Sequence, residues 1–543
     1  MQIDDPLYKS FLEQIQEFEN FRMTYASMHP HVPIDRDDPD VKRMIEAMAF
    51  FSARTHRAGM NNIVSSQLRI FQQCFPYLLI PLPAMAMLKP RLTGQFAETI
   101  EIPKGCEFTF STQEGETALF LTLFSIRILP LFLTRADMRY TMGKGFRLLL
   151  QLNAPYARNE NIGQICLHIN HLNNYKASLQ VFHTLKQYIK KTSVVFNEKV
   201  GETTRGIPCD ISFGPQIDKN ENKWLNPILK ERFFFHFPIQ ELYLNINCPD
   251  PPRNWNQITI CFDLDIKWPR NLILSKELFH MYSVPVINLK KEMAHPVLCD
   301  GTKEEYPILY PDPEKKFQIQ DLAGVYSVEN QGMLPLRPGI IAGGSESYEI
   351  VQKTDLKTGI REHCLLLNMP EAFEKPKTIA VDAAWFQPGF SKNIDQQIKV
   401  LPYGRTLSGL EWETLGQIVS HSDNRFGADK ENFLNLFILK NKPDLTLNDL
   451  FSILRSMGNV LQNEFKDVLN LLTGMRVQHA PAKKSEDTGT LRRIYYLKFA
   501  KLDPGFMPLV ETFIDHIEKI LDGWLPEIMI EVKIEVPEKS VQR

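Results

Sequence analysis

The sequence has none of the short motifs that mark common enzyme sites. It contains no G-x-x-x-x-G-K-[ST] phosphate loop, no G-x-G-x-x-G after a strand, no H-E-x-x-H and no G-x-S-x-G elbow. Such motifs place a phosphate at a helix N-terminus, a zinc ion between two histidines, or a serine on a strained turn. Because all of them are missing, we predict no catalytic residue and no enzyme activity.

Four segments are the nearest candidates for a catalytic or metal-binding site, and a structural role is favoured for each. The double glycine of Gly343–Ser347 is suited to a turn, and Cys364 begins the apolar run CLLL, which favours a buried thiol. His168 and His171 have no carboxylate or cysteine at ligand spacing. The acidic residues within 35–40 lack the glycine and glutamate of a calcium loop, and they suit a helix N-terminus. We therefore predict no metal site and no cofactor.

Bulk composition excludes further classes. The formal net charge is -2, without the basic excess that is typical of nucleic-acid binders. The longest apolar run, 118–134, is interrupted by Arg127 and Pro130 and is shorter than the roughly twenty residues of a membrane helix. None of the eight cysteines forms a C-x-x-C pair, which favours reduced thiols, and the acidic N-terminus does not resemble a signal peptide. We predict a cytoplasmic protein that binds no nucleic acid.

The N-terminal region is predicted to be helical. Residues 6–27 have apolar positions at helical spacing, and Asp38 and Pro39 are suited to begin a second helix. Gly59 is predicted to end that helix, and a third helix follows it up to residue 75. Pro76 and the prolines after it are predicted to prevent further helix. These helices could form a small bundle within the chain, or they could pack their apolar faces on helices of other chains. The apolar residues that we predict to face partner helices are Phe11, Ile15, Phe18, Val41, Met44, Ile45, Met48, Phe51, Val64, Leu68 and Phe71.

The segment 38–88 resembles the TssF family, which supplies a baseplate wedge protein of bacterial type VI secretion systems. The family has a D-P-x-V-x-R helix that contains A-F-hydrophobic-x-A-R, and later a P-x-Y-hydrophobic-x-x-P-x-P-x-M-A signature. The matching residues here are Asp38, Pro39, Val41, Arg43, Ala49, Phe50, Ala53, Arg54, Pro76, Tyr77, Pro81, Pro83, Met85 and Ala86. The order and spacing of these pieces over fifty residues carry the resemblance.

Two later segments also resemble the family, whereas a third segment matches it at only two positions. Residues 226–246 resemble an aromatic family segment, which we predict to be a buried strand ending at Pro238. Residues 284–289 resemble the family's V-P-x-x-N-L signature, and Asn288 is predicted to bond its own backbone in a tight turn. The family's N-R-D-L-P motif would fall at 404–410, where only Arg405 and Leu407 match.

The resemblance implies a structural subunit that acts by shape and interface. The implied partners are a second copy of the chain, TssG, TssE, TssK and the VgrG spike, with the sheath and tube reached indirectly. The implied location is the cytoplasmic face of the inner membrane, with membrane contact only through other subunits. Two alternatives remain open. One is a wedge or tail protein of a phage or phage-like contractile injection particle, and the other is an enzyme with an unrecognised site in the β-rich middle.

The whole chain is predicted to be an α+β multidomain protein. A length of 543 residues is enough for roughly three to four domains. We predict a helical segment at 1–75, β-rich domains at 76–250 and 251–430, and a C-terminal α+β domain at 431–543. In the last of these, Thr446 and Asp449 form a predicted capping box, apolar residues from Leu450 to Leu472 make one long face, and 527–536 alternates as a half-buried strand.

Overall fold

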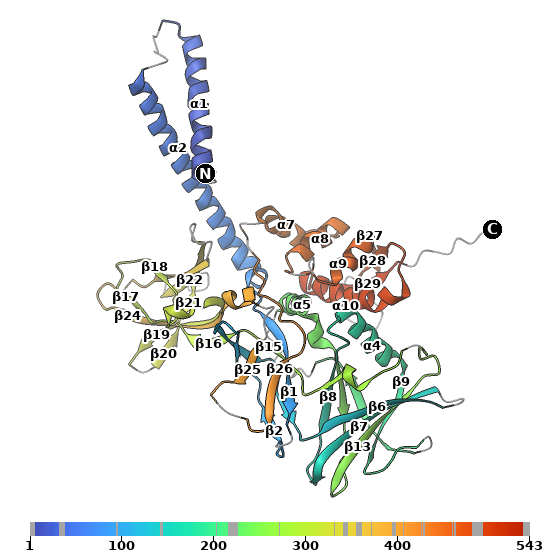
Figure 1. The fold of residues 1–543 in the computed structure, drawn as a ribbon. Helices are drawn as coiled ribbons and strands as arrows, with labels where there is room; N and C mark the ends of the chain where they lie inside the picture. The colour runs from blue at the N-terminus through green and yellow to red at the C-terminus, as the bar shows by residue number, and fades with distance from the viewer. Residues whose placement is uncertain are drawn as a thin grey trace, which may run out of the picture. The chain divides into compact units, whose positions relative to one another are not determined.

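The computed structural model has an α+β fold, and none of its described helices is long and apolar enough to cross a membrane. The described residues divide into two compact units, one of Met1–Pro76 with Arg425–Phe433 and one of Tyr77–Asn424 with Leu434–Arg543. Figure 1 shows the elements of each unit. The structure describes residues 6–31, 38–93, 96–141, 145–201, 204–215, 226–270, 272–330, 332–339, 346–354, 361–370, 372–393, 398–404, 407–424, 426, 429–458, 460, 463–480 and 492–535.

The first unit contains two long helices, α1 (Pro6–Met28) and α2 (Pro39–Cys74). The start of α2 is as predicted, since the side chain of Asp38 accepts a hydrogen bond from the Asp40 amide at 2.9 Å. The predicted break at Gly59 is wrong, because α2 runs through it as one helix of 36 residues. One glycine weakens a helix interior by only about 1 kcal/mol, and no proline follows to remove a hydrogen bond.

The prediction that Pro76 prevents further helix is wrong, because Pro76 begins the short helix α3 (Pro76–Leu79). Proline at the first helical position loses no intrahelical hydrogen bond. The chain then becomes extended and enters a closed barrel with strand order β1-β15-β4-β3-β25-β26. These strands are β1 (Met85–Leu92), β3 (Glu107–Ser111), β4 (Thr117–Thr122), β15 (Val284–Ile287), β25 (Lys399–Pro402) and β26 (Leu410–Thr414). The barrel thus draws strands from both segments that were predicted as separate β-rich domains.

Asn288 follows β15 and connects segments that are far apart in the chain. Its side-chain amide donates to the Leu119 carbonyl at 2.8 Å, and its side-chain oxygen accepts from the Gln387 amide at 2.7 Å. The predicted structural role is therefore correct, but the predicted local turn bond is not. Sequence spacing cannot reveal partners that lie about 100 or more residues away.

We expect Asn288→Ala to lower the free energy of unfolding by about 2–4 kcal/mol. The side chain is buried, and its loss leaves two backbone groups without these partners, each of which costs roughly 1–3 kcal/mol. Urea denaturation beside the exposed control Asn256→Ala measures the difference, and the control is expected to stay within about 0.5 kcal/mol of the parent. Equal midpoints for the two variants would contradict this role for Asn288.

Two further sheets and helix α4 (Tyr175–Tyr188) follow the barrel in the second unit. One sheet has the order β10-β9-β13-β7-β6 and the other β11-β12-β8-β14, while β2 pairs with β5. Their bounds are β2 (Ile100–Ile102), β5 (Ile126–Ile128), β6 (Phe132–Thr141), β7 (Gly145–Arg158), β8 (Gln164–Ile169), β9 (Ile189–Phe196), β10 (Ile207–Pro208), β11 (Asp210–Phe213), β12 (Tyr243–Asn247), β13 (Trp255–Leu264) and β14 (Phe279–Met281).

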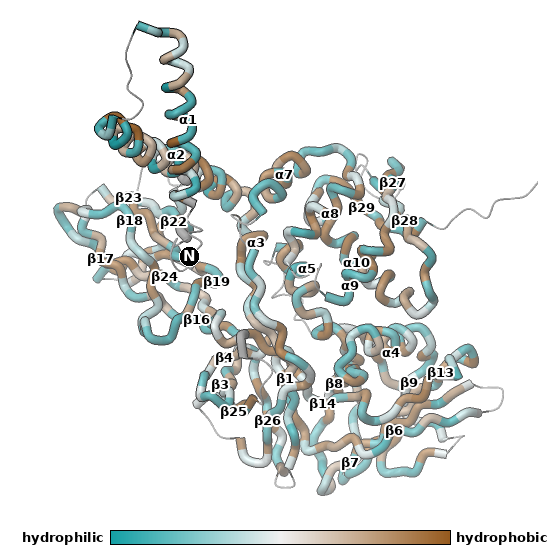
Figure 2. Tube along the Cα trace, turned by 45° about the horizontal axis from the view of Figure 1, so that its top comes forward, coloured by the Kyte–Doolittle hydropathy of each residue, from teal (hydrophilic) through white to brown (hydrophobic). Residues whose placement is uncertain are grey.

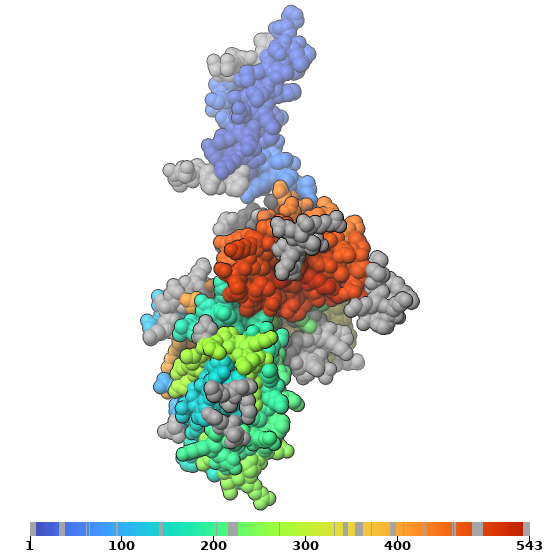
Figure 3. All heavy atoms as spheres, turned by 90° about the vertical axis from the view of Figure 1, so that its right-hand side faces the viewer, coloured from blue at the N-terminus to red at the C-terminus, as the bar shows by residue number. Residues whose placement is uncertain are grey.

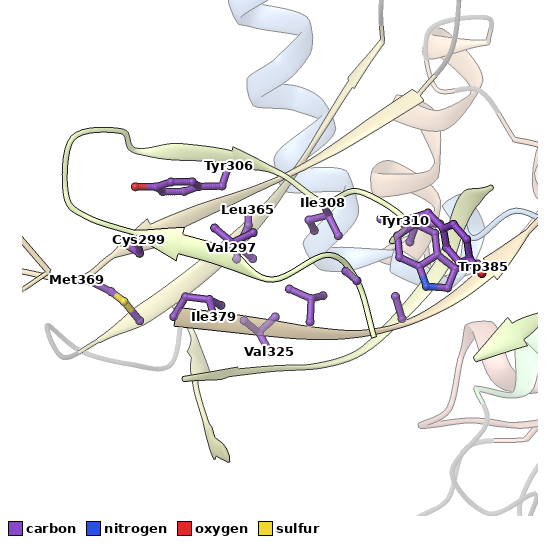
Figure 4. Close-up of a cluster of buried hydrophobic side chains, with 14 of the residues drawn as sticks. Val297, Cys299, Tyr306, Ile308, Tyr310, Val325, Leu365, Met369, Ile379 and Trp385 are labelled. Atoms are coloured by element: carbon purple, nitrogen blue, oxygen red, sulfur yellow. The ribbon is translucent and has the colours of Figure 1, made fainter. Parts of the chain in front are cut away.

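Two sheets between β15 and β25 enclose a core of their own (Figure 4). Trp385 is fully buried there, with its indole N–H donating to the Glu292 carbonyl at 2.8 Å. The first sheet has the order β16-β24-β19-β20 with β17 also on β24, and the second has the order β18-β23-β22-β21. Their bounds are β16 (Lys290–Met293), β17 (Val297–Cys299), β18 (Glu305–Pro307), β19 (Gln318–Glu329), β20 (Gly332–Pro335), β21 (Arg337–Pro338), β22 (Ser347–Thr354), β23 (Arg361–Asn368) and β24 (Lys377–Phe386).

The buried strand predicted within 226–246 is instead a helix for most of its length, α5 (Pro227–His236), followed by the 3₁₀ turn η2 (Pro238–Glu241). Asn226 caps α5 by accepting a hydrogen bond from the Ile228 amide at 2.9 Å. Phenylalanines favour strands, and a helix that is buried on most sides lacks the polar face that would identify it.

The C-terminal part contains helices and a three-stranded sheet with order β27-β28-β29. The capping box of Thr446 and Asp449 is confirmed. The long apolar face is divided, because Gly458 has a φ of +94° and the chain leaves the helical path there. In the space-filling view this part, coloured orange to red, forms a continuous surface (Figure 3). The elements are α7 (Lys430–Lys440), α8 (Leu447–Arg455), α9 (Phe465–Leu471), β27 (Leu472–Ala480), β28 (Arg492–Phe499), α10 (Met507–Trp524) and β29 (Met529–Ile534).

Candidate interaction surface on the N-terminal helices

Helices α1 and α2 pack side by side through small and aromatic residues (Figure 1). Ala49 and Ala53 on α2 are fully buried, so the two backbones approach closely there. The Phe11 and Phe50 rings meet edge to face with centroids 6.4 Å apart. The Ser52 hydroxyl donates to the Gln14 side-chain oxygen at 2.6 Å. One face of each helix is thus used within the chain.

The structure separates the predicted interface residues into two groups. Those with partly covered side chains are Phe11, Ile15, Phe18, Val41, Ile45, Val64 and Leu68, and Phe71 is completely buried. Met44, Met48 and Phe51 are 65%, 52% and 64% exposed. Val41 and Ile45 precede Ala49 and Ala53 at steps of four, whereas Met44, Met48 and Phe51 lie on the neighbouring side of α2.

Exposed apolar side chains are concentrated on these two helices. Hydrophobic residues recur along both of them in Figure 2. A soluble protein rarely leaves many large apolar side chains grouped together in water, and such groups mark interaction sites. Besides Met44, Met48 and Phe51, the exposed large hydrophobic residues among the described part of α1 and α2 are Tyr8, Leu12, Phe21, Met23, Tyr25, Met28, Phe50, Met60, Ile63 and Ile70.

Phe71 belongs to a cluster inside the first unit. Its ring lies 5.1 Å from Phe75, 5.5 Å from Phe426 and 5.2 Å from Phe433, measured between centroids. Phe426 and Phe433 come from a segment that is more than 350 residues further along the chain and that the sequence did not connect with the helices. Helical spacing showed that Phe71 would be covered, but it could not show by what.

His168 and Cys364, from two of the four candidate segments for a catalytic or metal site, have buried side chains. Burial lowers the pKa of His168 to about 4, and its Nε2 lies 2.9 Å from the Ile239 carbonyl. Cys364 is buried in β23. Within the described ranges no three His, Cys, Asp or Glu side chains are grouped to hold a metal ion. Gly343–Ser345, Asp35, Asp37 and Arg405 lie outside the described residues.

An open cavity of about 670 Å³ in the second unit also contains histidine. Its lining includes His236, Pro238, Val419 and Asn463. Burial lowers the pKa of His236 to about 4, and its Nε2 lies 2.8 Å from the Pro83 carbonyl oxygen. A neutral histidine bound to a backbone carbonyl holds the chain in place.

Comparison with known proteins agrees with the predicted resemblance. The profile of the family described as "Type VI secretion system, TssF" matches residues 14–190, which begin within α1 and include all of α2. Over these residues the chain is similar to the TssF family. No curated protein matches the sequence.

Two solved structures resemble this chain over nearly its whole length. A chain of the type VI secretion TssK–TssF–TssG baseplate subcomplex aligns with a TM-score of 0.69 at 14% identity, covering 91% of this chain and 96% of that one. A chain of the type VI secretion baseplate complex aligns with a TM-score of 0.62 at 15% identity, covering 98% and 97%. At such identities the likeness shows a shared fold. A match to an anti-feeding prophage baseplate has a TM-score of only 0.23 and carries no argument.

Proposed function

We propose that this chain is a structural subunit of the type VI secretion baseplate wedge. The match of residues 14–190 to the TssF family model and the exposed apolar side of α1 and α2 support the proposal. The observation that carries it is the group Met44, Met48 and Phe51, whose side chains are each more than half exposed on a helix that lies within the matched family region. Fully burying one such side chain contributes about 1.5–3 kcal/mol, so three of them suffice to anchor a partner helix.

The proposed partners are TssG, TssK and a second copy of this chain. TssG and TssK accompany TssF in one of the similar assemblies, which supports their choice. TssE and the VgrG spike are proposed as further contacts of the assembled wedge. We place the wedge in the cytoplasm and propose that it reaches the inner membrane only through other subunits.

Co-expression of this chain with the TssG and TssK proteins of the same genome tests the proposal. We expect one complex that remains intact through affinity purification and size-exclusion chromatography. If the chain instead elutes alone while TssG and TssK associate with each other, the proposed wedge role is wrong. Co-purification with phage head or portal proteins would favour the injection-particle alternative, for which the structure offers no specific support.

We further propose that the chain acts without turnover or a bound metal. Dialysis against EDTA is expected to leave both the thermal unfolding midpoint and TssG binding unchanged, because neither depends on metal coordination. Differential scanning fluorimetry and a pull-down before and after dialysis measure the two quantities. A midpoint that falls by several degrees and is restored by one particular metal would show that a structural metal site exists.

A further inference from the structure

Helix α10 and helix α5 pack against each other (Figure 1). A buried histidine lies at their contact. His516 on α10 is 3% exposed, and its ring stacks on Phe234 of α5 with centroids 3.3 Å apart. The two helices are also close at Gly523, where an added Cβ would lie 3.1 Å from the Ile228 side chain. Any change at His516 therefore acts on a tight helix–helix contact between segments that are 285 residues apart in the chain.

Both ring nitrogens of His516 face carboxylates. Nδ1 lies 2.5 Å from Oε2 of Glu231 on α5, and Nε2 lies 3.6 Å from Oε2 of Glu241 on η2. A neutral imidazole has one N–H donor and one lone-pair acceptor, whereas the imidazolium has two donors. Only the protonated ring can satisfy both carboxylates, because a neutral ring would point a lone pair at one of them.

We propose that protonated His516 is a clamp that holds α10 against α5 and η2, and that α10 loosens when the ring loses its proton. On α5 itself, Lys230 and Arg232 flank Glu231 in the sequence. From α4, His183 contacts Thr512 and Glu511, one turn before His516. From α9, Phe465 contributes an apolar ring 5.8 Å from Phe234, and Glu518 on α10 accepts from the Val532 amide of β29.

The direction of the pH effect follows from the charges. Burial alone would lower the pKa of His516, but the hydrogen bonds and charges of Glu231 and Glu241 outweigh it and raise the pKa above its usual value. A pKa raised in the folded state stabilises the contact fully below the unfolded value of about 6.5, and this stabilisation is lost as the pH rises through the folded value. The contact is therefore strongest in mildly acidic solution and weakens toward alkaline pH.

Hydrogen–deuterium exchange of the full chain at about pH 6 and about pH 8.5 tests the clamp. The protection factor of peptides from Met507–Trp524 is the intrinsic exchange rate of the unfolded chain divided by the observed exchange rate at the same pH. We expect this protection to fall at the higher pH by about tenfold for each unit by which folding raises the pKa of His516. Peptides from β7 and β13, which lie away from the clamp, serve as the internal reference.

Three variants make the result specific. His516→Gln is expected to remove the pH dependence in α10, whereas His183→Gln on α4 is expected to keep it. Glu241→Gln keeps the Glu231 pair, so it is expected to fold and to show a reduced pH response even where His516→Gln fails to fold. Equal protection at both pH values in the parent chain overturns the proposal. So does a full pH response in either His516→Gln or Glu241→Gln.

Discussion

The double variant Met44→Asp and Met48→Asp is expected to abolish TssG binding while the isolated chain stays folded. Both methionines are more than half exposed, so the new carboxylates remain hydrated in the free chain. In an assembled helix bundle the same carboxylates would be buried without a partner, and each unpaired buried charge costs about 3–5 kcal/mol. Even a single such penalty weakens the dissociation constant by at least about a hundredfold.

A pull-down with TssG, together with circular dichroism of the variant, measures both parts of this prediction. Met529→Asp is the matched control, since Met529 is 42% exposed on β29 and receives the same change outside the helices. The control is expected to bind TssG normally. If the double variant binds as well as the control, this side of α2 is not the TssG interface.

Leu68→Asp would be a less informative probe than the methionine variants. Leu68 is partly covered in the isolated chain and lies three residues before the buried Phe71. A loss of binding in Leu68→Asp would therefore mix damage to the first unit with damage to an interface. Met44 and Met48 reduce this difficulty because more than half of each side chain is exposed in the isolated chain.

Local signals in the sequence predicted local structure well. Asp38 with Pro39, and Thr446 with Asp449, correctly marked helix starts, because a cap needs only the residues within one turn. The alternation over 527–536, which includes Ile530 and Val532, correctly marked a half-buried strand, since the strand period is two. The family signature was also read correctly from residues within a short segment.

Features that depend on distant partners could not be predicted in this way. The continuous passage of α2 through Gly59 reflects the packing of a long helix, whereas a single glycine resembles a helix end. The aromatic segment 227–236 resembled a strand because its helix is enclosed by other elements, including α10. The Glu231–His516 pair was missed for the same reason, since a lone histidine and a lone glutamate far apart in the sequence have no shared pattern.

The prediction of interface residues was limited in the same way, because local spacing does not show which distant segment covers a residue. Helical spacing grouped Val41, Ile45, Met44 and Met48 on one apolar side, because steps of three and four residues connect them. It could not divide the part that α1 covers from the part that remains open, since that division depends on where α1 lies. The structure makes the division, and it places Met44 and Met48 among the exposed residues.

Phe71→Ala is expected to lower the stability of the first unit by about 3–5 kcal/mol, the usual cost of removing a fully buried phenylalanine. The loss follows because Phe75, Phe426 and Phe433 would surround the resulting cavity. Urea denaturation, combined with limited proteolysis of α2, measures the effect beside Ile70→Ala, whose side chain is 55% exposed. The control is expected to change stability by no more than about 0.5 kcal/mol. If Phe71→Ala leaves stability unchanged but prevents TssG binding, Phe71 acts at a partner interface, and its cluster with the 425–433 segment does not hold the unit together.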